Sequence, residues 1–288
     1  MARGLRFFSG FDQLGASWRG FVRVPWRAVT MVMGVLNVTP DSFFDGGRWF
    51  DQEAAVRRGH EMIAEGADVV DVGGESTRPG AGPVDEAEER RRVLTVVAAL
   101  APHVRVSIDT RKAGVAEAAV AAGATLINDV SATLWPVAAA YGVGWVAMHM
   151  QGEPSTMQAA PRYRDVVAEV RAFLAGAAAT AARAGVEEIW VDPGIGFGKT
   201  MAHNLQLLRH LEEVAPAGRP VLVGTSRKSF LGRLAAGADQ PPAPSDQRLA
   251  GSVAAAVWCM VHGAAMVRVH DVAATVQAAR LVANTMAA

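Results

Sequence analysis

Polar side chains recur in this chain at the points where short apolar runs end. Asp109, Asn128 and Asp192 each close such a run. A carboxylate accepts hydrogen bonds from two N–H groups, and a carboxamide supplies both a donor and an acceptor. We expect the three side chains to point into one cavity, where they could bind a flat heterocycle whose edges carry amide-like donors and acceptors. For Asp192 alone, an N-cap of the following helix is an equally good interpretation, because Pro193 comes next.

The stretch 32–50 shows this pattern most fully. It is apolar and β-branched up to Asn37, and it then becomes a polar loop that contains Asp45, Gly46 and Gly47. A run that is hydrophobic on both faces and ends abruptly is typical of a buried parallel strand that leads into a site. Taken alone, the stretch is explained equally well by a strand followed by an Asx-type turn.

A second group of residues is cationic. Lys228 follows the seventh apolar run, while Arg268 and His270 lie two positions apart in the last run. Alternate residues of a strand face the same side, so Arg268 and His270 are expected to point the same way. Together with Arg78, which lies in a glycine-rich stretch, they suit a diphosphate. We interpret Arg227, the neighbour of Lys228, as a solvated helix residue.

The glycine-rich stretch 192–199, DPGIGFGK, has the glycine content of a phosphate loop but lacks the Walker spacing. We interpret it as a loop through which the backbone and Phe197 close over a ligand. The sequence has no cluster of cysteine and histidine with zinc spacing and no nucleophile elbow.

These residues lie at the ends of strands that alternate with helices. Strands are predicted at 29–37, 67–73, 104–109, 125–128, 144–149, 188–192, 220–224 and 266–270. Helices are predicted after an N-cap at Asp51 and at 85–100, 111–122, 136–141, 163–184, 202–214, 227–235, 247–262 and 273–286. Eight strand–helix units with apolar strands predict an α/β fold, a closed (β/α)₈ TIM barrel whose strands all end at one mouth. A doubly wound open sheet is the main alternative, but it gives distant strands no reason to end in polar residues or glycine.

Composition limits the class of protein. The 288 residues suit one large barrel or two ordinary domains, and no linker separates two domains. Lysine plus arginine and aspartate plus glutamate each number 28, so nothing points to nucleic acid or an acidic membrane as a partner. The one cysteine, Cys259, excludes an internal disulfide, and we expect it in the core or in an interface.

Residues 1–27 differ from the rest because they hold six aromatic residues among glycines. We interpret them as a short irregular or hairpin lead-in that caps an apolar surface, ahead of a barrel domain at 28–288. Charged residues interrupt the apolar stretch, so the N-terminus is a poor signal peptide. The apolar stretch 251–267 contains His262 and is interpreted as a helix and a strand, not as a membrane span. A cytoplasmic location is predicted.

Seven motifs, which occur in order from the first predicted strand to the last, resemble those of one family. They are NVTPDSF at 37–43, GGESTRPGA at 73–81, SIDT at 107–110, IND at 127–129, DPGIGFGK at 192–199, TSRKSF at 225–230 and RVHD at 268–271. They cover about residues 28–288 and are similar to the motifs of dihydropteroate synthase. One departure is Ala132, in a segment where glycines are common in that family.

The resemblance implies a TIM barrel that joins 6-hydroxymethyl-7,8-dihydropterin diphosphate to 4-aminobenzoate, giving 7,8-dihydropteroate and diphosphate in folate synthesis. It also implies a Mg²⁺ cofactor held at Asn37, a homodimer and inhibition by sulfonamides. The implied pterin residues are Asp109, Asn128, Asp192, Lys228, Met148 and Phe197. The implied diphosphate residues are Asn37, Arg78, Arg268 and His270. The implied aminobenzoate residues are Thr77, Pro79, Phe43, Phe197 and Ser229. The implied catalytic residues are Asp109, Lys228, Arg78 and Asp45.

The chemistry of this reaction is consistent with such residues. The aryl amine is a weak, neutral nucleophile, so the hard step is the departure of diphosphate from the pterin methylene. An electron-rich dihydropterin stabilises the positive charge that develops there, and Asp109 is placed to favour it, so we expect an SN1-like displacement. Asp45 and Arg78 carry opposite charges on two glycine-rich loops, and we predict that they latch these loops over the ligand.

Two other functions stay open on the sequence. A pterin-binding methyltransferase that acts with a corrinoid partner shares Asp109, Asn128 and Asp192, but it has no need for Lys228 together with Arg268. A paralogue that binds pterin without catalysis is expected to have lost loop residues such as Lys228, which this chain retains.

Overall fold

Eight short, largely buried strands alternate with helices along the chain. The computed structural model describes residues 30–39, 52–76, 82–153, 156–216, 218–236 and 240–288. The strands are β1 (Met31–Asn37), β2 (Val69–Gly73), β3 (Arg105–Asp109), β4 (Leu126–Asp129), β5 (Gly144–Met148), β6 (Ile189–Asp192), β7 (Leu222–Val223) and β8 (Met266–Val269). The predicted strands agree with these bounds to within two residues at each end.

The strands close into a barrel. All neighbours pair in parallel, in the order β6-β5-β4-β3-β2-β1-β8-β7. A further parallel bridge between Val191 and Val221 joins the two ends of this order. The predicted (β/α)₈ barrel is therefore confirmed, and the open doubly wound sheet is wrong. Because every strand runs the same way, the carboxyl ends form a single mouth.

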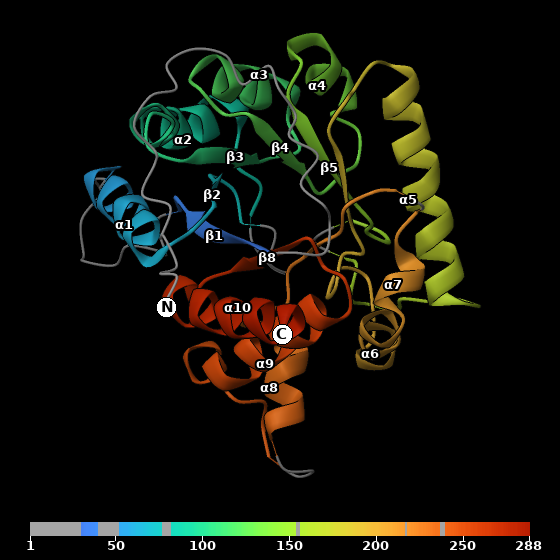
Figure 1. The fold of residues 1–288 in the computed structure, drawn as a ribbon. Helices are drawn as coiled ribbons and strands as arrows, with labels where there is room; N and C mark the ends of the chain where they lie inside the picture. Colours follow the sequence, from blue (N-terminus) through green and yellow to red (C-terminus); the bar gives the residue numbers. More distant parts are fainter. Residues whose placement is uncertain (1–29, 40–51, 77–81, 154–155, 217, 237–239) are drawn as a thin grey trace, which may run out of the picture.

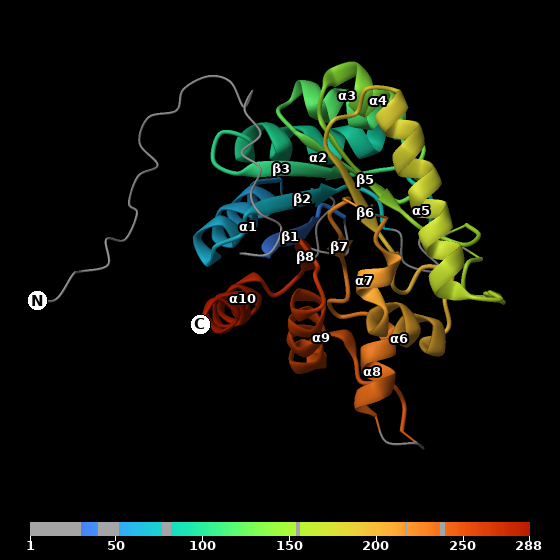
Figure 2. The same ribbon diagram turned by 45° about the vertical axis from the view of Figure 1, so that its right-hand side comes forward.

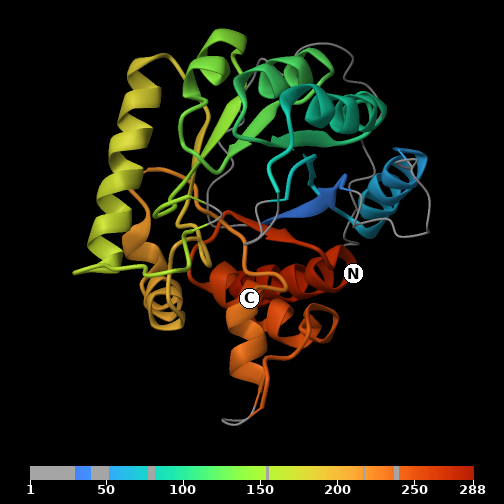
Figure 3. The same cartoon turned by 180° about the vertical axis from the view of Figure 1, so that it is seen from behind.

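Helices cover the outside of the barrel (Figure 1). They are α1 (Gln52–Glu65), α2 (Glu86–Leu100), α3 (Ala113–Ala121), α4 (Trp135–Tyr141), α5 (Val166–Arg183), α6 (Met201–Arg209), α7 (Leu211–Val214), α8 (Ser229–Ala235), α9 (Leu249–Val261) and α10 (Val272–Ala287), with a 3₁₀ turn at Ser245–Gln247. Views from the front and from behind show α2, α3 and α4 along one half of the barrel and α8, α9 and α10 on the other (Figures 1 and 3). The turned view shows α9 and α10 side by side (Figure 2).

Several helices begin at the local signals that the sequence carries. The side chains of Asp85, Asp165 and Thr200 accept hydrogen bonds from backbone N–H groups in the first turns of α2, α5 and α6. These bonds satisfy donors that a helix start otherwise leaves unpaired. The predicted N-cap at Asp51 lies outside the described residues.

The helix predicted at 202–214 is not continuous. It divides into α6 and α7 at His210, whose backbone leaves the helical region and whose Nδ1 lies 2.8 Å from Glu213 Oε1. No glycine or proline marks this break, so the sequence carried no signal for it.

Side chains inside the barrel form layers, because alternate residues of each strand point inward. We use "apolar layer" for the inner cluster of Met33, Val69, Leu126, Val146, Trp190, Leu222 and Met266. Nearer to the mouth, two positions further along several of these strands, lies what we call the polar layer: Asp71, Asp109, Asn128, Asp192 and Arg268. The larger hydrophobic core lies between the strands and the helices.

Two further sequence predictions concern burial and location. Cys259 is fully buried in α9, as predicted. None of the helices in the described part of the chain is long and apolar enough to cross a membrane. The predicted lead-in at 1–27 lies outside the described residues, and its boundary with the barrel domain stays a prediction.

Candidate active site

Arg268 lies in the middle of the polar layer and binds two carboxylates. Its Nε donates to Asp71 Oδ2 and its Nη2 donates to Asp109 Oδ2, each at 2.6 Å. Asp71 Oδ2 also accepts from Asn128 Nδ2 at 2.9 Å. Side chains from β2, β3, β4 and β8 are thus joined in one hydrogen-bonded network at the mouth.

The charge state of this network follows from burial and from the ion pairs. Burial raises the pKa of Asp109 to about 7, while the nearby Arg268 guanidinium opposes that rise. Asp71 and Asp109 raise the pKa of Arg268 above its usual value although burial lowers it, so Arg268 stays charged. Asp109 therefore takes up a proton close to neutral pH, even though it lies beside a permanent cation.

Asp71 is a site residue that sequence reasoning missed. It is fully buried in the middle of β2, within a run that was interpreted only as an apolar strand. A signal was present, because a carboxylate inside a buried strand needs a charged or hydrogen-bonding partner. Only the closed barrel shows that this partner is Arg268, which lies 197 positions away in the sequence.

Asp192 and Lys228 form the other side of the mouth. Asp192 is buried at the end of β6, and its Oδ1 accepts from Gly194 N at 2.7 Å, so it makes a local turn as well as facing the mouth. Burial raises the pKa of Asp192, and the Lys228 ammonium opposes this rise. Burial likewise lowers the pKa of Lys228 to about 8, against the pull of Asp192.

Lys228 also contacts the glycine-rich loop that follows β6. Its ammonium donates to the carbonyl of Ile195 and lies 4.7 Å from the centre of the Phe197 ring. The contact with an aromatic face is the geometry of a cation–π interaction. The predicted pterin residues Lys228 and Phe197 are therefore neighbours, although one follows β7 and the other follows β6.

His270 and Arg227 differ in what they bind. His270 is held by Ser226, whose Oγ lies 3.1 Å from both His270 N and His270 Nδ1. Arg227 was predicted to be a solvated helix residue; its side chain is partly exposed, but the residue lies before the helix and forms an ion pair. It precedes α8 with a left-handed φ of 58°, and its Nε and Nη2 bind the carboxylate of Asp271 at 3.0 and 2.5 Å. An ion pair thus joins the motif that contains Arg227 to the motif that contains Asp271.

His149 directly follows β5, one residue beyond the observed end of the strand, and its side chain faces a lysine. Its Nδ1 lies 3.0 Å from Lys199 Nζ, and both side chains are buried. Burial, aided by the Lys199 charge, lowers the pKa of His149 to about 3, so the ring is neutral at physiological pH.

The structure describes some of the remaining predicted site residues, while others lie outside the described ranges. Met148 is buried at the end of β5 and pairs in register with Asp192. Asn37 is half-buried at the end of β1, and Ser229 is exposed at the start of α8. Outside the described residues lie Phe43, Asp45, Thr77, Arg78 and Pro79. The predicted latch between the two glycine-rich loops therefore stays a prediction.

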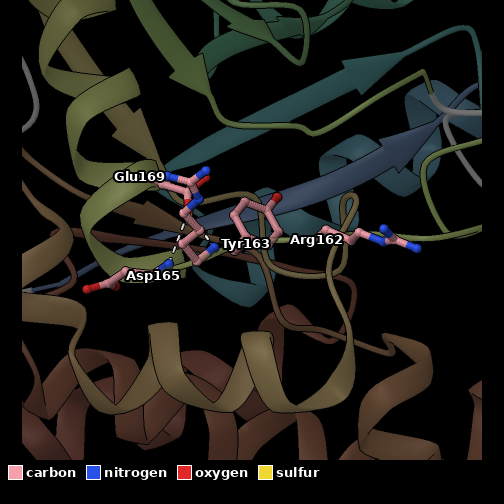
Figure 4. A pocket seen from close by; sticks show the side chains of 5 residues that line it. Arg162, Tyr163, Asp165 and Glu169 are labelled. Atoms are coloured by element: carbon pink, nitrogen blue, oxygen red, sulfur yellow. Dashed lines mark hydrogen bonds between the residues drawn. The ribbon is translucent and has the colours of Figure 1, made fainter.

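An open hollow lies outside the mouth, beside the start of α5 (Figure 4). It is lined by Arg162, Tyr163, Arg164, Asp165 and Glu169. Glu169 Oε1 accepts from Arg164 N at 2.7 Å and from Asp165 N at 3.0 Å, which fixes the chain that precedes α5. The Tyr163 hydroxyl donates to Gly198 O at 2.9 Å, so this hollow adjoins the glycine-rich loop of the site.

A closed barrel with acids, amides and cations at the carboxyl ends of its strands defines an enzyme of the (β/α)₈ class. Residues 33–270 match the model of the family described as pterin binding enzyme. The dihydropteroate synthase of Mycobacterium leprae is 48% identical over 264 residues, which cover 88% of this chain and 93% of that protein.

Solved structures agree with this match. The dihydropteroate synthase of Xanthomonas albilineans with 4-aminobenzoic acid has a TM-score of 0.82 and 46% identity, covering 90% of this chain and 94% of that one. The Burkholderia cenocepacia enzyme complexed with 7,8-dihydropteroate has a TM-score of 0.79 and 48% identity, covering 90% and 92%. This chain belongs to the pterin-binding enzyme family, and within it to the dihydropteroate synthases.

Proposed function

We propose that the mouth of this barrel joins 6-hydroxymethyl-7,8-dihydropterin diphosphate to 4-aminobenzoate and releases diphosphate. The observation that carries this proposal is the polar layer, in which acids and an amide from β3, β4 and β6 lie beside Lys228 and Arg268. The related structures with 4-aminobenzoic acid and with 7,8-dihydropteroate support the same substrate and product.

The pterin ring is assigned to Asn128, Asp192 and Lys228. Asn128 gives its amide N–H to Asp71, so its carbonyl oxygen remains to accept from a ring N–H group. The Asp192 carboxylate accepts from ring N–H groups, while the Lys228 ammonium donates to a ring acceptor. Met148 and Phe197 supply apolar contacts to the ring faces. A flat heterocycle with alternating donors and acceptors satisfies this set of partners.

The bond that breaks joins the pterin methylene to a diphosphate oxygen, and the bond that forms joins the methylene to the arylamine nitrogen. Positive charge develops on the methylene as the diphosphate leaves, and the ionised Asp109 stabilises it. The amine proton then passes to solvent. A neutral Asp109 cannot give this stabilisation, so the reaction requires the deprotonated form.

The leaving diphosphate is assigned to Arg268 and His270. Two N–H groups of Arg268 are used by Asp71 and Asp109, which leaves further guanidinium donors for the anion. Ser226 fixes the His270 ring through Nδ1. Arg78, which lies outside the described residues, is predicted to add a second guanidinium.

Magnesium is proposed as the cofactor, with Asn37 as its one protein ligand. No group of three or more His, Cys, Asp and Glu side chains in the described ranges could hold a metal ion. A carboxamide oxygen is a hard ligand that suits Mg²⁺, which commonly keeps its waters and binds substrate phosphates. Such an ion neutralises charge on the departing diphosphate.

The 4-aminobenzoate is assigned to Phe197 and Ser229, with Phe43, Thr77 and Pro79 as predicted partners outside the described residues. Phe197 lies next to Lys228, and Ser229 is the residue that follows Lys228. The site for the amine therefore adjoins the pterin site on the side of the β7–α8 connection. This adjacency supports attack on the pterin methylene without a covalent enzyme intermediate.

A homodimer, inhibition by sulfonamides and a cytoplasmic location complete the proposed description. Large apolar side chains on α9 and α10 are unusually exposed, which supports a protein partner on that face: Trp258 by 47%, Val261 by 49%, Leu281 by 69% and Met286 by 62%. Light scattering on the purified chain tests the dimer, and a monomer at micromolar concentration would contradict it.

The test of the function is turnover. The protein is incubated with the pterin diphosphate, Mg²⁺ and 4-aminobenzoate, and the release of diphosphate and the formation of dihydropteroate are both measured. The variant Asp192→Asn is expected to lose most activity, while the matched variant Asp246→Asn, on an exposed turn, keeps it. No release above background by the wild-type protein overturns the proposal.

A further inference from the structure

The loop 193–198, which follows β6, is held by side chains from four places in the chain. Four successive carbonyl groups each accept a hydrogen bond from a different side chain. The pairs are Ile195 O with Lys228 Nζ, Gly196 O with Gln158 Nε2, Phe197 O with Lys199 Nζ, and Gly198 O with the Tyr163 hydroxyl. A loop with four successive carbonyls bound in this way has one preferred conformation.

The same loop lies directly on the backbone that follows β5. A Cβ atom on Gly194, which has a φ of 65°, would come 1.9 Å from His149 O. A Cβ atom on Gly198, which has a φ of 60°, would come 2.3 Å from Gln151 O. Both glycines are required by the left-handed conformation and by this close approach. The loop and the end of β5 are therefore packed as one unit.

Lys199 is the side chain that joins the two parts of this unit. Its ammonium lies 3.0 Å from His149 Nδ1, 3.3 Å from His149 O and 3.0 Å from Phe197 O. An ammonium has three N–H donors, so the three acceptors account for all of them. The Lys199 ammonium can only donate, so the neutral His149 ring is assigned the tautomer in which Nδ1 accepts.

Burial of this lysine is costly for the fold. Lys199 is 2% exposed, and within the described residues its ammonium contacts His149 and Phe197 and forms no ion pair with a carboxylate. Burial lowers the pKa of Lys199 to about 7, which the Asp192 carboxylate only partly opposes. A cation that is buried without a contacting anion lowers stability, so a role in the site explains its presence better than a role in the core.

We propose that Lys199 is a positioning residue, which ties the 193–198 loop to the end of β5 and thereby holds Phe197 and Lys228 where they meet the pterin. The inference rests on the proposed function, because it assigns the pterin to those two residues. Lys228 donates to Ile195 O within the same loop, and its ammonium lies over the Phe197 ring. Release of the loop would move both groups together.

The test compares two ligands. In Lys199→Met the aliphatic stem is kept and the three donors are removed. The affinity for a dihydropterin, measured by calorimetry, is expected to fall at least tenfold, and KM for the pterin diphosphate is expected to rise by a similar factor. The affinity for inorganic diphosphate, which is assigned to Arg268 and His270, is expected to stay within twofold. A general loss of folded protein would lower the binding stoichiometry for both ligands, whereas the proposal expects a lower affinity for the dihydropterin alone.

Tyr163→Phe provides a milder test, and Tyr141→Phe is its matched control. Tyr163→Phe removes only the hydroxyl that binds Gly198 O and is expected to weaken dihydropterin binding two- to fivefold. Tyr141, on α4, is half exposed, and its variant is expected to bind as the wild type does. If Lys199→Met does not fold, the comparison of Tyr163→Phe with Tyr141→Phe replaces it. Equal dihydropterin affinities of these two variants overturn the proposal.

The pH dependence of binding gives an independent measurement. The titratable groups that face Lys199 are His149 after β5, Asp192 from β6 and Lys228 from the β7–α8 connection, with the Tyr163 hydroxyl from the segment before α5. Wild-type affinity for the dihydropterin is expected to fall above about pH 7, as Lys199 loses its proton. In Lys199→Met the fall is expected only near pH 8, where Lys228 titrates.

The outcomes separate this inference from the proposed function. A wild-type protein that binds no dihydropterin contradicts the proposed function itself. A wild-type protein that binds it, beside a folded Lys199→Met variant with affinity within twofold and the same pH profile, contradicts only the positioning role.

Discussion

Leu126 and Asn128 lie two residues apart on the same face of β4, and they meet very different surroundings. Leu126 is packed in the apolar layer with side chains such as Trp190 and Met266. Asn128, in the polar layer, is bound to Asp71, which in turn binds Arg268. The same strands therefore form both the packed core and the polar mouth, and the two layers are only two residues apart along a strand.

The two layers depend on different forces. The apolar layer gains free energy from removal of carbon from water, which is non-directional and tolerates modest changes of shape. The polar layer buries carboxylates and cations, and each group is tolerable only while its partners remain. We infer that the first layer holds the barrel together, while the second carries the chemistry at some cost in stability. Each prediction below tests one part of this contrast.

The largest effect on stability is expected for Leu126→Ala in the apolar layer. Leu126 is fully buried, so its truncation leaves a cavity and is expected to cost about 2–5 kcal/mol of the free energy of unfolding. Urea denaturation measures the loss. Below the melting transition, KM for the pterin diphosphate should change little. A large rise in KM with unchanged stability would show that the layers are not separable.

Asp109→Asn is expected to have the opposite profile. The amide retains an acceptor for Arg268 but cannot stabilise positive charge on the methylene, so kcat should fall about 100-fold, the usual size for loss of one electrostatic group. The free energy of unfolding should fall by less than in Leu126→Ala, because Arg268 keeps its ion pair with Asp71 after Asp109 is neutralised. Diphosphate release and urea denaturation give the two values, and a destabilised variant with normal kcat would reverse the assignment.

The pH dependence of activity should report on the same layer. Asp109 must be ionised, and burial raises its pKa to about 7, so kcat/KM should fall as the pH drops below about 7. Lys199 and Lys228 must both be protonated, and burial lowers their pKa values to about 7 and about 8, so kcat/KM should also fall as the pH rises above about 7. The expected profile is a narrow bell, and in Asp109→Asn the acid limb should disappear. Persistence of that limb would assign it to another group.

The smallest effect is expected outside both layers, at Ala132 in the loop after β4. Ala132 has a left-handed φ of 54°, which strains a residue that carries a Cβ. Ala132→Gly should relieve this strain and raise the free energy of unfolding by about 0.5–1 kcal/mol. Melting curves give the change, and substrate constants should be unaltered. A loss of stability would mean that backbone entropy outweighs the strain.

The sequence alone was sufficient to predict the barrel and many of the residues at its mouth. Alternation of apolar runs with helices predicted all eight strands, because hydrophobic period and turn residues are local properties that the chain carries along its length. It also placed Asp109, Asn128 and Asp192 at strand ends, where parallel strands must bring them to one mouth. The break at His210 was missed because no proline or glycine marks it.

Only the tertiary structure determined the partner of each buried polar group. The sequence placed Arg268 and Asp71 in separate strands, and closure between β6 and β7 with pairing of β1 and β8 brought them within 2.6 Å of each other. Arg227 looked solvated beside Lys228, yet it binds Asp271. Lys199 looked like part of a loop motif, yet it is buried against His149. Such pairings depend on contacts between residues distant in the chain, and no local pattern of residue types encodes them.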